Sequence, residues 1–117
     1  MIGGVSMILK ETISLEQIWS DYNHYYDDMV KFCIDFKNRT VAIDGDMHID
    51  LENELYDNGS EYSDIFGGNI MKDPLEIIWE AHPNIERNRI LGIGHGRELT
   101  DPDVIDELSE ILYEWIK

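Results

Sequence analysis

The stretch MVKFCIDFKNRTVAID, residues 29–44, decides the fold class of this chain. Its first half places apolar side chains at every second position, the period of a strand with one buried face: Val30, Phe32, Ile34 and Phe36. Residues 37–39 form a short polar turn in which Asn38 tolerates a positive φ, and residues 40–44 return as a second strand. The stretch therefore predicts an antiparallel β-hairpin.

Further strands are predicted on the C-terminal side of this hairpin. Residues 65–71 and 75–81 carry strand-like apolar runs, and residues 89–93 form a third candidate. Gly67 and Gly68 indicate a bulge or close packing in the first of these strands. The run Leu-Glu-Ile-Ile-Trp at 75–79 is apolar enough for a central position in the sheet.

The segment that follows the hairpin fits two kinds of structure. Residues 41–51 alternate between apolar and polar side chains, which is typical of a strand. Met47, Leu51 and Leu55 are also spaced four residues apart, and Gly59 would end a helix. We favour a short helix over 49–56.

Two capped helices enclose the predicted strands. Ser14 and Gln17 fit a capping box, and the apolar stripe after them predicts a helix over 15–26. Near the C-terminus, Thr100 is the expected cap, Asp103 its box partner, and Pro102 occupies the first turn. The pattern favours an α+β fold: a single two-layer domain with a four- or five-stranded, mainly antiparallel sheet and the N- and C-terminal helices packed on one face.

Length and composition predict one domain over residues 1–117. Residues 1–6 are expected to be a disordered or non-native leader, with Met7 as an alternative start. The chain carries neither a long apolar stretch nor a signal-peptide pattern, so we expect a cytoplasmic location. Its single cysteine, Cys33, excludes an internal disulfide and fits a buried strand thiol.

Acidic residues dominate the charge of the chain. It holds 25 Asp and Glu against 9 Lys and Arg, which gives a formal net charge of −16. This charge argues against binding nucleic acid and against binding anionic membranes. A basic protein surface or a cation remains an eligible partner. Arg87 and Arg89, the one basic cluster, could dock on the chain's own acidic run or on that of an identical chain, so a homodimer is also considered; a surface loop with ordinary charges is the favoured interpretation.

Eight carboxylates and no Lys or Arg lie between Asp44 and Asp64, and His48 stands within this acidic run. The candidate metal ligands are Asp46, His48, Asp50 and Glu52. On a helix His48 and Glu52 lie one turn apart, whereas on a strand His48 shares a face with Asp46 or Asp50. A third ligand for a divalent cation would come from His24, His82 or His95; the alternative is a solvated acidic face. No other cofactor is expected.

The glycine-rich loop at 92–97 lies between a candidate strand and a helix, the order that can cradle phosphate. Asp101 and Asp103 already occupy the start of that helix, where they would repel phosphate. A tight turn that needs positive φ is the favoured interpretation.

Several short motifs occur in an order that resembles a small prokaryotic family of unknown function. These are the hairpin, an acid-x-His-x-Asp segment, a Gly-Ser turn, an aromatic-Gly-x-Asn strand and an Asp-Pro-capped last helix. The resemblance extends over roughly residues 8–116, and the residues that match best are His48, Asp50, Gly59, Ser60, Gly68 and Asn69. The loop at 92–97 departs from the pattern. The resemblance implies the fold and a cytoplasmic location, and it supplies no catalytic residues.

These observations favour a small acidic protein-interaction module for a basic partner. A divalent-metal-binding protein centred on His48 and an inhibitor that mimics nucleic-acid charge are the alternatives. An enzyme is the least supported class.

Overall fold

The predicted hairpin lies within the main sheet of the computed structural model, which describes residues 7–80, 82 and 84–117. Strand β1 (Met29–Asp35) pairs antiparallel with β2 (Thr40–Ile43), and Cys33 lies opposite Ala42. The positive φ of the turn belongs to Arg39 rather than Asn38, because the backbone and side-chain amides of Asn38 both donate to Asp35. The predicted leader, residues 1–6, lies outside the described residues.

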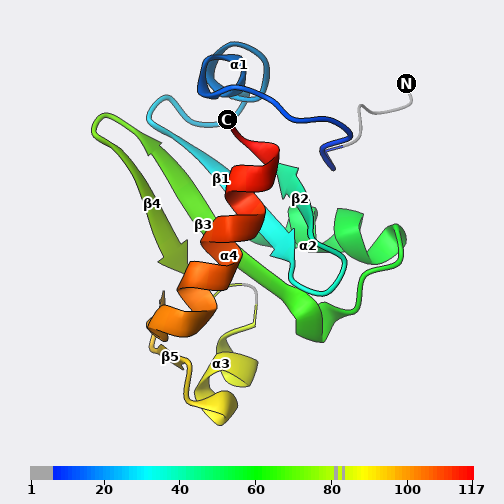
Figure 1. Cartoon of the computed structure of the whole chain (residues 1–117), viewed down its shortest axis with the longest axis vertical. Helices are drawn as coiled ribbons and strands as arrows, with labels where there is room; N and C mark the ends of the chain where they lie inside the picture. The colour runs from blue at the N-terminus through cyan, green and yellow to red at the C-terminus, as the bar shows by residue number, and fades with distance from the viewer. Residues whose placement is uncertain (1–6, 81, 83) are drawn as a thin grey trace.

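The sheet has six antiparallel strands in the order β2-β1-β3-β4-β6-β5, which confirms the α+β fold (Figure 1). Strand β3 (Ile65–Lys72) pairs with β1 and with β4 (Leu75–Glu80). The sheet exceeds the predicted four or five strands because the glycine-rich loop forms two short strands, β5 (Gly94–His95) and β6 (Glu98–Leu99). Ala81, the predicted end of β4, lies outside the described residues.

The terminal helices pack on one face of the sheet, as predicted. Figure 1 shows α4 (Pro102–Trp115) crossing in front of the sheet, with α1 (Leu15–Asp21) above it and α2 (His48–Asp57) behind the sheet. The main core contains Ile18 of α1 and Ile111 and Leu112 of α4. Phe32 of β1 and Ile70 of β3 belong to the same core. A smaller core on the opposite face joins Leu51 and Leu55 of α2 to Cys33 and Ala42.

Of the two predicted helix caps, one is confirmed and one is wrong. Ser14 and Gln17 form the expected capping box of α1. This helix ends at Asp21 instead of residue 26, because the chain then turns so that the backbone of His24 donates to the Asp44 carboxylate. In α4 the cap is Asp101, not Thr100, since the Asp101 carboxylate accepts from the two free N–H groups of the first turn.

Residues 89–93 were predicted as a strand, and this prediction is wrong. Helix α3 (Ile85–Leu91) occupies most of this segment and ends at Gly92, whose φ of 70° forms a left-handed cap. The apolar residues Ile90 and Leu91, which suggested a strand, are exposed on this helix. The apolar character of these two residues is therefore not a sign that they are buried.

The ambiguous acidic segment is helical, as favoured from the sequence. Helix α2 ends at Asp57, and Gly59 follows with a φ of 104°; a 3₁₀ helix, Tyr62–Asp64, then leads into β3. None of the helices in the described residues has the length and apolar character needed to cross a membrane.

Candidate functional site

A pocket of about 330 Å³ opens where the start of α2 meets the open face of the sheet. Its polar lining comes from five segments of the chain: Lys31 of β1, His48 and Glu52 of α2, Glu80 of β4, His82 after β4, and Arg97 of the β5–β6 turn. Four of these six ionisable groups are cationic or can become so, although the chain is strongly acidic. This local excess of basic groups distinguishes the pocket from the chain as a whole, which is strongly acidic.

The register of three strands assembles the floor of the pocket. Gly67 of β3 lies opposite Cys33 on one side and Glu80 on the other. A Cβ atom at Gly67 would lie 2.3 Å from the His82 carbonyl oxygen and 3.1 Å from the Cδ2 atom of His48. Only glycine therefore leaves room for both histidines to approach the sheet, which explains the close packing expected at this position.

His48 is the first residue of α2, and its side chain is buried. Its Nε2 atom lies 2.8 Å from the carbonyl oxygen of Gly68. A carbonyl can only accept, so Nε2 carries the proton and the neutral ring presents an unprotonated Nδ1. This Nδ1 atom lies 3.4 Å from Oε2 of Glu80. Burial lowers the pKa of His48, an effect that the Gly68 bond and the charge of Glu80 oppose.

Glu80 connects the two histidines of the pocket. Its Oε1 atom accepts a hydrogen bond of 2.7 Å from Nδ2 of Asn69, the neighbour on β3. Its Oε2 atom faces His48 and also lies 3.9 Å from Nδ1 of His82. The two imidazole planes are nearly parallel, at 8°, with ring centres 6.5 Å apart. One carboxylate oxygen can thus share a proton with either ring.

Glu52 lies one helical turn after His48 and is also buried. Burial raises the pKa of its carboxyl group, and the attraction of Arg87 opposes this rise. His48 and Glu52 are therefore two ionisable groups that burial pushes toward their neutral forms. Such perturbed groups in one pocket mark a candidate functional site.

Two cations complete the lining. The Lys31 ammonium lies 5.2 Å from the ring centre of Tyr26, in a cation–π contact. Arg97 is exposed at the tip of the β5–β6 turn. Within the described part of the chain neither side chain forms an ion pair. Both positive charges are consequently available to a bound molecule.

The structure brings together two of the four predicted metal ligands, His48 and Glu52. Asp46 does not line the pocket and instead accepts from the Tyr26 hydroxyl, while Asp50 accepts from the backbone N–H of Met47 at 3.1 Å. Of the three suggested additional ligands, His82 lies beside His48. Among the described residues, no three His, Cys, Asp or Glu side chains form a group that could hold a metal ion. Metal binding therefore stays a prediction.

The sequence pattern did not identify Glu80, Lys31 and Arg97 as members of the site. The pair Gly67-Gly68 was the available signal, because it indicated a place where other groups approach a strand closely. Which groups approach depends on the strand register, and the register became known only with the structure.

Three other motifs have structural roles. Burial strongly raises the pKa of the Cys33 thiol, whose Sγ lies 3.5 Å from the backbone oxygen of His48. The loop at 92–97 contains the left-handed cap of α3 at Gly92 and the tight turn between β5 and β6, where Gly96 has a positive φ, as favoured. Arg87 donates to the Ser63 carbonyl and lies over the Phe66 ring, and it forms no ion pair with a described carboxylate.

Comparison with curated proteins and with solved structures found no match. A family model does match, and it covers residues 7–115, the extent over which the motifs indicated a resemblance. The chain therefore belongs to the family described as "Protein of unknown function (DUF5674)".

Proposed function

We propose that this protein binds a small anionic ligand in the pocket beside His48. The observation that carries the proposal is the presence of Lys31 and Arg97 at one pocket, without an ion pair in the described residues. Carboxylates outnumber Lys and Arg 25 to 9 in this chain, so two basic side chains at one pocket form an unusual local concentration of positive charge. A carboxylate or phosphate of a ligand would supply the partner that the chain does not.

His48 and Glu80 supply hydrogen-bond acceptors beside these cations. Because Nε2 of His48 donates to Gly68, the Nδ1 atom of the neutral ring can accept from a bound molecule. Glu80 presents its Oε2 atom at the same place. The expected ligand therefore carries a hydroxyl or N–H group near its anionic group, as hydroxy acids and phosphorylated alcohols do.

The two carboxyl groups of the pocket, those of Glu52 and Glu80, are expected to repel a bound anion only weakly. Burial raises the pKa of Glu52 and so favours its neutral form. Glu80 accepts from Asn69 and faces two imidazoles, and protonation of either ring would compensate its charge. The net charge of −16 repels anions at a distance, so affinity must come from short contacts with Lys31 and Arg97.

The test is thermal unfolding with inorganic phosphate, glycerol 3-phosphate and lactate. A ligand at about 100 times its dissociation constant stabilises the folded state by about 2.7 kcal/mol. We expect at least one anion to raise the Tm of the wild type, and Arg97→Ala to abolish the rise. Lys37→Ala, in the exposed β1–β2 turn, is the matched control and should keep it. The proposal fails if no anion stabilises the protein, or if Arg97→Ala responds like the wild type.

Divalent-cation binding at His48 is a second proposal, supported by a different observation. The Nε2–H of His48 is anchored on a backbone carbonyl while Nδ1 faces Glu80, which is how many metal-binding histidines are held. Zn²⁺ would then raise the Tm of the wild type, and His48→Ala would remove this effect. An unchanged zinc response in His48→Ala would exclude the site. Stabilisation by Zn²⁺ together with no response to anions would replace the first proposal by this one.

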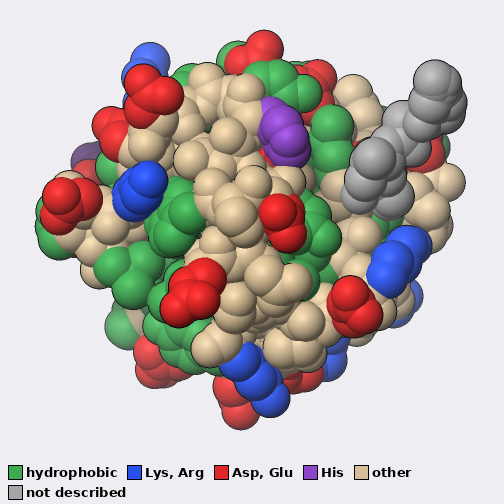
Figure 2. All heavy atoms as spheres, turned by 90° about the horizontal axis from the view of Figure 1, so that it is seen from above, with side chains coloured by type: hydrophobic (Ala, Val, Ile, Leu, Met, Phe, Trp, Pro, Cys, Tyr) green, Lys and Arg blue, Asp and Glu red, His purple; other side chains and the backbone are tan. Residues whose placement is uncertain are grey.

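Binding of a basic protein partner is a third proposal, and the outer face of α4 supports it. Five exposed carboxylates lie along this helix: Asp103, Asp106, Glu107, Glu110 and Glu114. Among the described residues, Glu114 alone of these has an ion pair, with Arg39. Figure 2 shows that on another face, seen from above, acidic side chains lie scattered among neutral and hydrophobic atoms. The row of carboxylates on α4, called the acidic row below, is therefore the better candidate for contact with a basic partner.

The double variant Glu107→Lys, Glu110→Lys tests the third proposal. Binding to a basic partner should weaken with this variant and with added salt. If the partner is a DNA-binding protein and DNA competes with this chain for it, the acidic row mimics nucleic-acid charge. A partner that binds the double variant as tightly as the wild type would contradict both interpretations.

A further inference from the structure

Strand β4 is apolar in sequence but poorly covered in the structure. Its sequence, LEIIWE, is typical of a central strand, yet Leu75 is 54% exposed and Ile78 is 40% exposed. The neighbouring β3 is almost wholly buried, and α4 packs mainly over β1 and β2. Ile77 and Trp79 pack against the main core, but the fold of one chain does not explain the exposed Leu75 and Ile78.

The outer edge of β4 is also open. Strand β6 pairs with β4 only through Glu80 and Glu98, so residues 75–79 have no strand partner on this side within the described part of the chain. Figure 1 shows the upper part of β4 at the margin of the sheet, above the short strands. An apolar edge of this length is a template for pairing with another strand.

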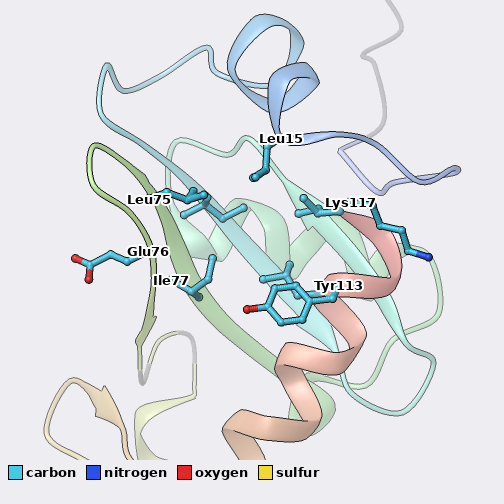
Figure 3. Close-up of a pocket in the computed structure, with 9 residues that line it drawn as sticks. Leu15, Leu75, Glu76, Ile77, Tyr113 and Lys117 are labelled. Carbon is cyan, nitrogen blue, oxygen red and sulfur yellow. The ribbon is translucent and has the colours of Figure 1, made fainter.

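A groove of about 340 Å³ adjoins this edge, between β4 and α4. Figure 3 shows Leu75 and Ile77 of β4 and Tyr113 of α4 around it, with Glu76 and Lys117 at its margin. Tyr113 is 59% exposed. The open edge and an exposed apolar surface thus lie together.

We propose that a second copy of this chain covers this surface, with the two β4 strands pairing antiparallel about Ile77. In this register Leu75 lies opposite Trp79 and Glu76 lies opposite Ile78, so no carboxylate faces a carboxylate directly. Directly opposite residues of an antiparallel ladder point to the same face. The grooves of both copies therefore lie on one face of a continuous sheet, where each Leu75 and Tyr113 loses solvent contact.

Local charge favours a second copy over an acidic or basic partner. The chain carries −16, yet the groove beside this edge is lined by one acidic and one basic side chain, Glu76 and Lys117. Glu76 has no ion pair among the described residues, and in this register it lies opposite the uncharged Ile78, so pairing brings no carboxylates together. The long-range repulsion of two acidic chains remains, and salt reduces it.

The test is sedimentation equilibrium of the whole chain from micromolar to near-millimolar concentration. The wild type is expected to form a dimer that tightens with added NaCl. Leu75→Lys and Ile78→Lys, one on each face of the strand, should each raise the dissociation constant roughly tenfold or more. Ile90→Lys, an exposed isoleucine of α3 with 69% exposure, is the matched control and should behave as the wild type. Circular dichroism verifies that each variant is folded.

Hydrogen exchange locates the contact independently of substitutions. Amides of residues 75–79 should exchange more slowly as the protein concentration rises, while those of α3 should not change. A chain that stays monomeric over the whole range overturns the proposal. A dimer that both lysine variants leave intact, that salt dissociates, or that leaves these amides unprotected also overturns it.

Discussion

Substitution of Gly67 by alanine would test how the site is assembled. The new Cβ atom would lie 2.3 Å from the His82 carbonyl oxygen, a separation that non-bonded atoms do not tolerate, and 3.1 Å from Cδ2 of His48. The nearer atom belongs to the backbone, so relief requires a shift of the segment after β4 or of β3 itself. Either movement displaces at least one imidazole from Glu80.

The expected loss of stability follows from two opposing effects. Overpacking of this kind costs about 1–3 kcal/mol. Replacing a strand glycine by alanine returns about 0.5–1 kcal/mol, since the unfolded chain is less flexible. We therefore expect a net destabilisation of about 1–2 kcal/mol, measured by urea unfolding with tryptophan fluorescence. In the same variant, the NMR resonances of the His48 and His82 rings should shift, while that of His24, which contacts Asp44 elsewhere, should not.

Gly92→Ala is the control for this substitution. Its φ of 70° makes alanine strained, at about 1 kcal/mol, but a Cβ atom there meets open space. It should lose similar stability and leave the His48 and His82 resonances in place. A Gly67→Ala protein that is as stable as the wild type within about 0.5 kcal/mol, with unmoved His48 and His82 resonances, would refute the packing argument.

Three further substitutions test buried or capping groups. Because burial raises the pKa of Glu52, its ionisation destabilises the folded state as pH rises above 4.5, the ordinary value; Glu52→Gln should be more stable than the wild type at pH 7 and equally stable below pH 4.5, and equal stability at both pH values would contradict this. Asp35 is fully buried and accepts from four donors, including the buried Ser60 hydroxyl, so Asp35→Ala should lose about 3 kcal/mol in urea unfolding and Asp35→Asn less, since it keeps one acceptor oxygen. Asp101→Ala should lose about 1 kcal/mol of thermal stability through its lost cap, whereas Thr100→Ala should lose no more than a few tenths; the reverse order would restore Thr100 as the cap.

The fold was predictable where local signals agree with tertiary packing. The capping box at Ser14 and the alternation in residues 29–36 each specify one structure, and both were confirmed. The prediction failed where apolar residues are exposed: Ile90 and Leu91 suggested a strand, but they project from α3 into solvent. The strands β5 and β6 were missed because two residues are too few to show a period.

Sequence reasoning singled out His48 first among the residues that line the pocket. This residue was evident because it is the only histidine among the carboxylates, and the helical alternative placed it one turn from Glu52, which lines the same pocket. Glu80 reaches His48 through the antiparallel register of β3 and β4, which sets Glu80 opposite Gly67. A shift of one residue in this register would turn Glu80 to the other face of the sheet. Local sequence does not determine such a register, so Glu80 could not be assigned to the site before the structure was known.

The acidic run has a different significance once its members are placed in the structure. Asp44 takes a positive φ and accepts from His24, Asp50 accepts from Met47 at the N-cap of α2, and Glu52 is buried in the pocket. If the run acted through its total charge, neutralising any one of these residues would change ligand binding equally. The structure instead predicts that Glu52→Gln strengthens anion binding, because it removes an ionisable carboxyl group from the pocket lining, whereas Asp50→Asn, outside the pocket, leaves binding unchanged. If both substitutions changed anion binding equally, net charge and not the position of Glu52 would explain the effect.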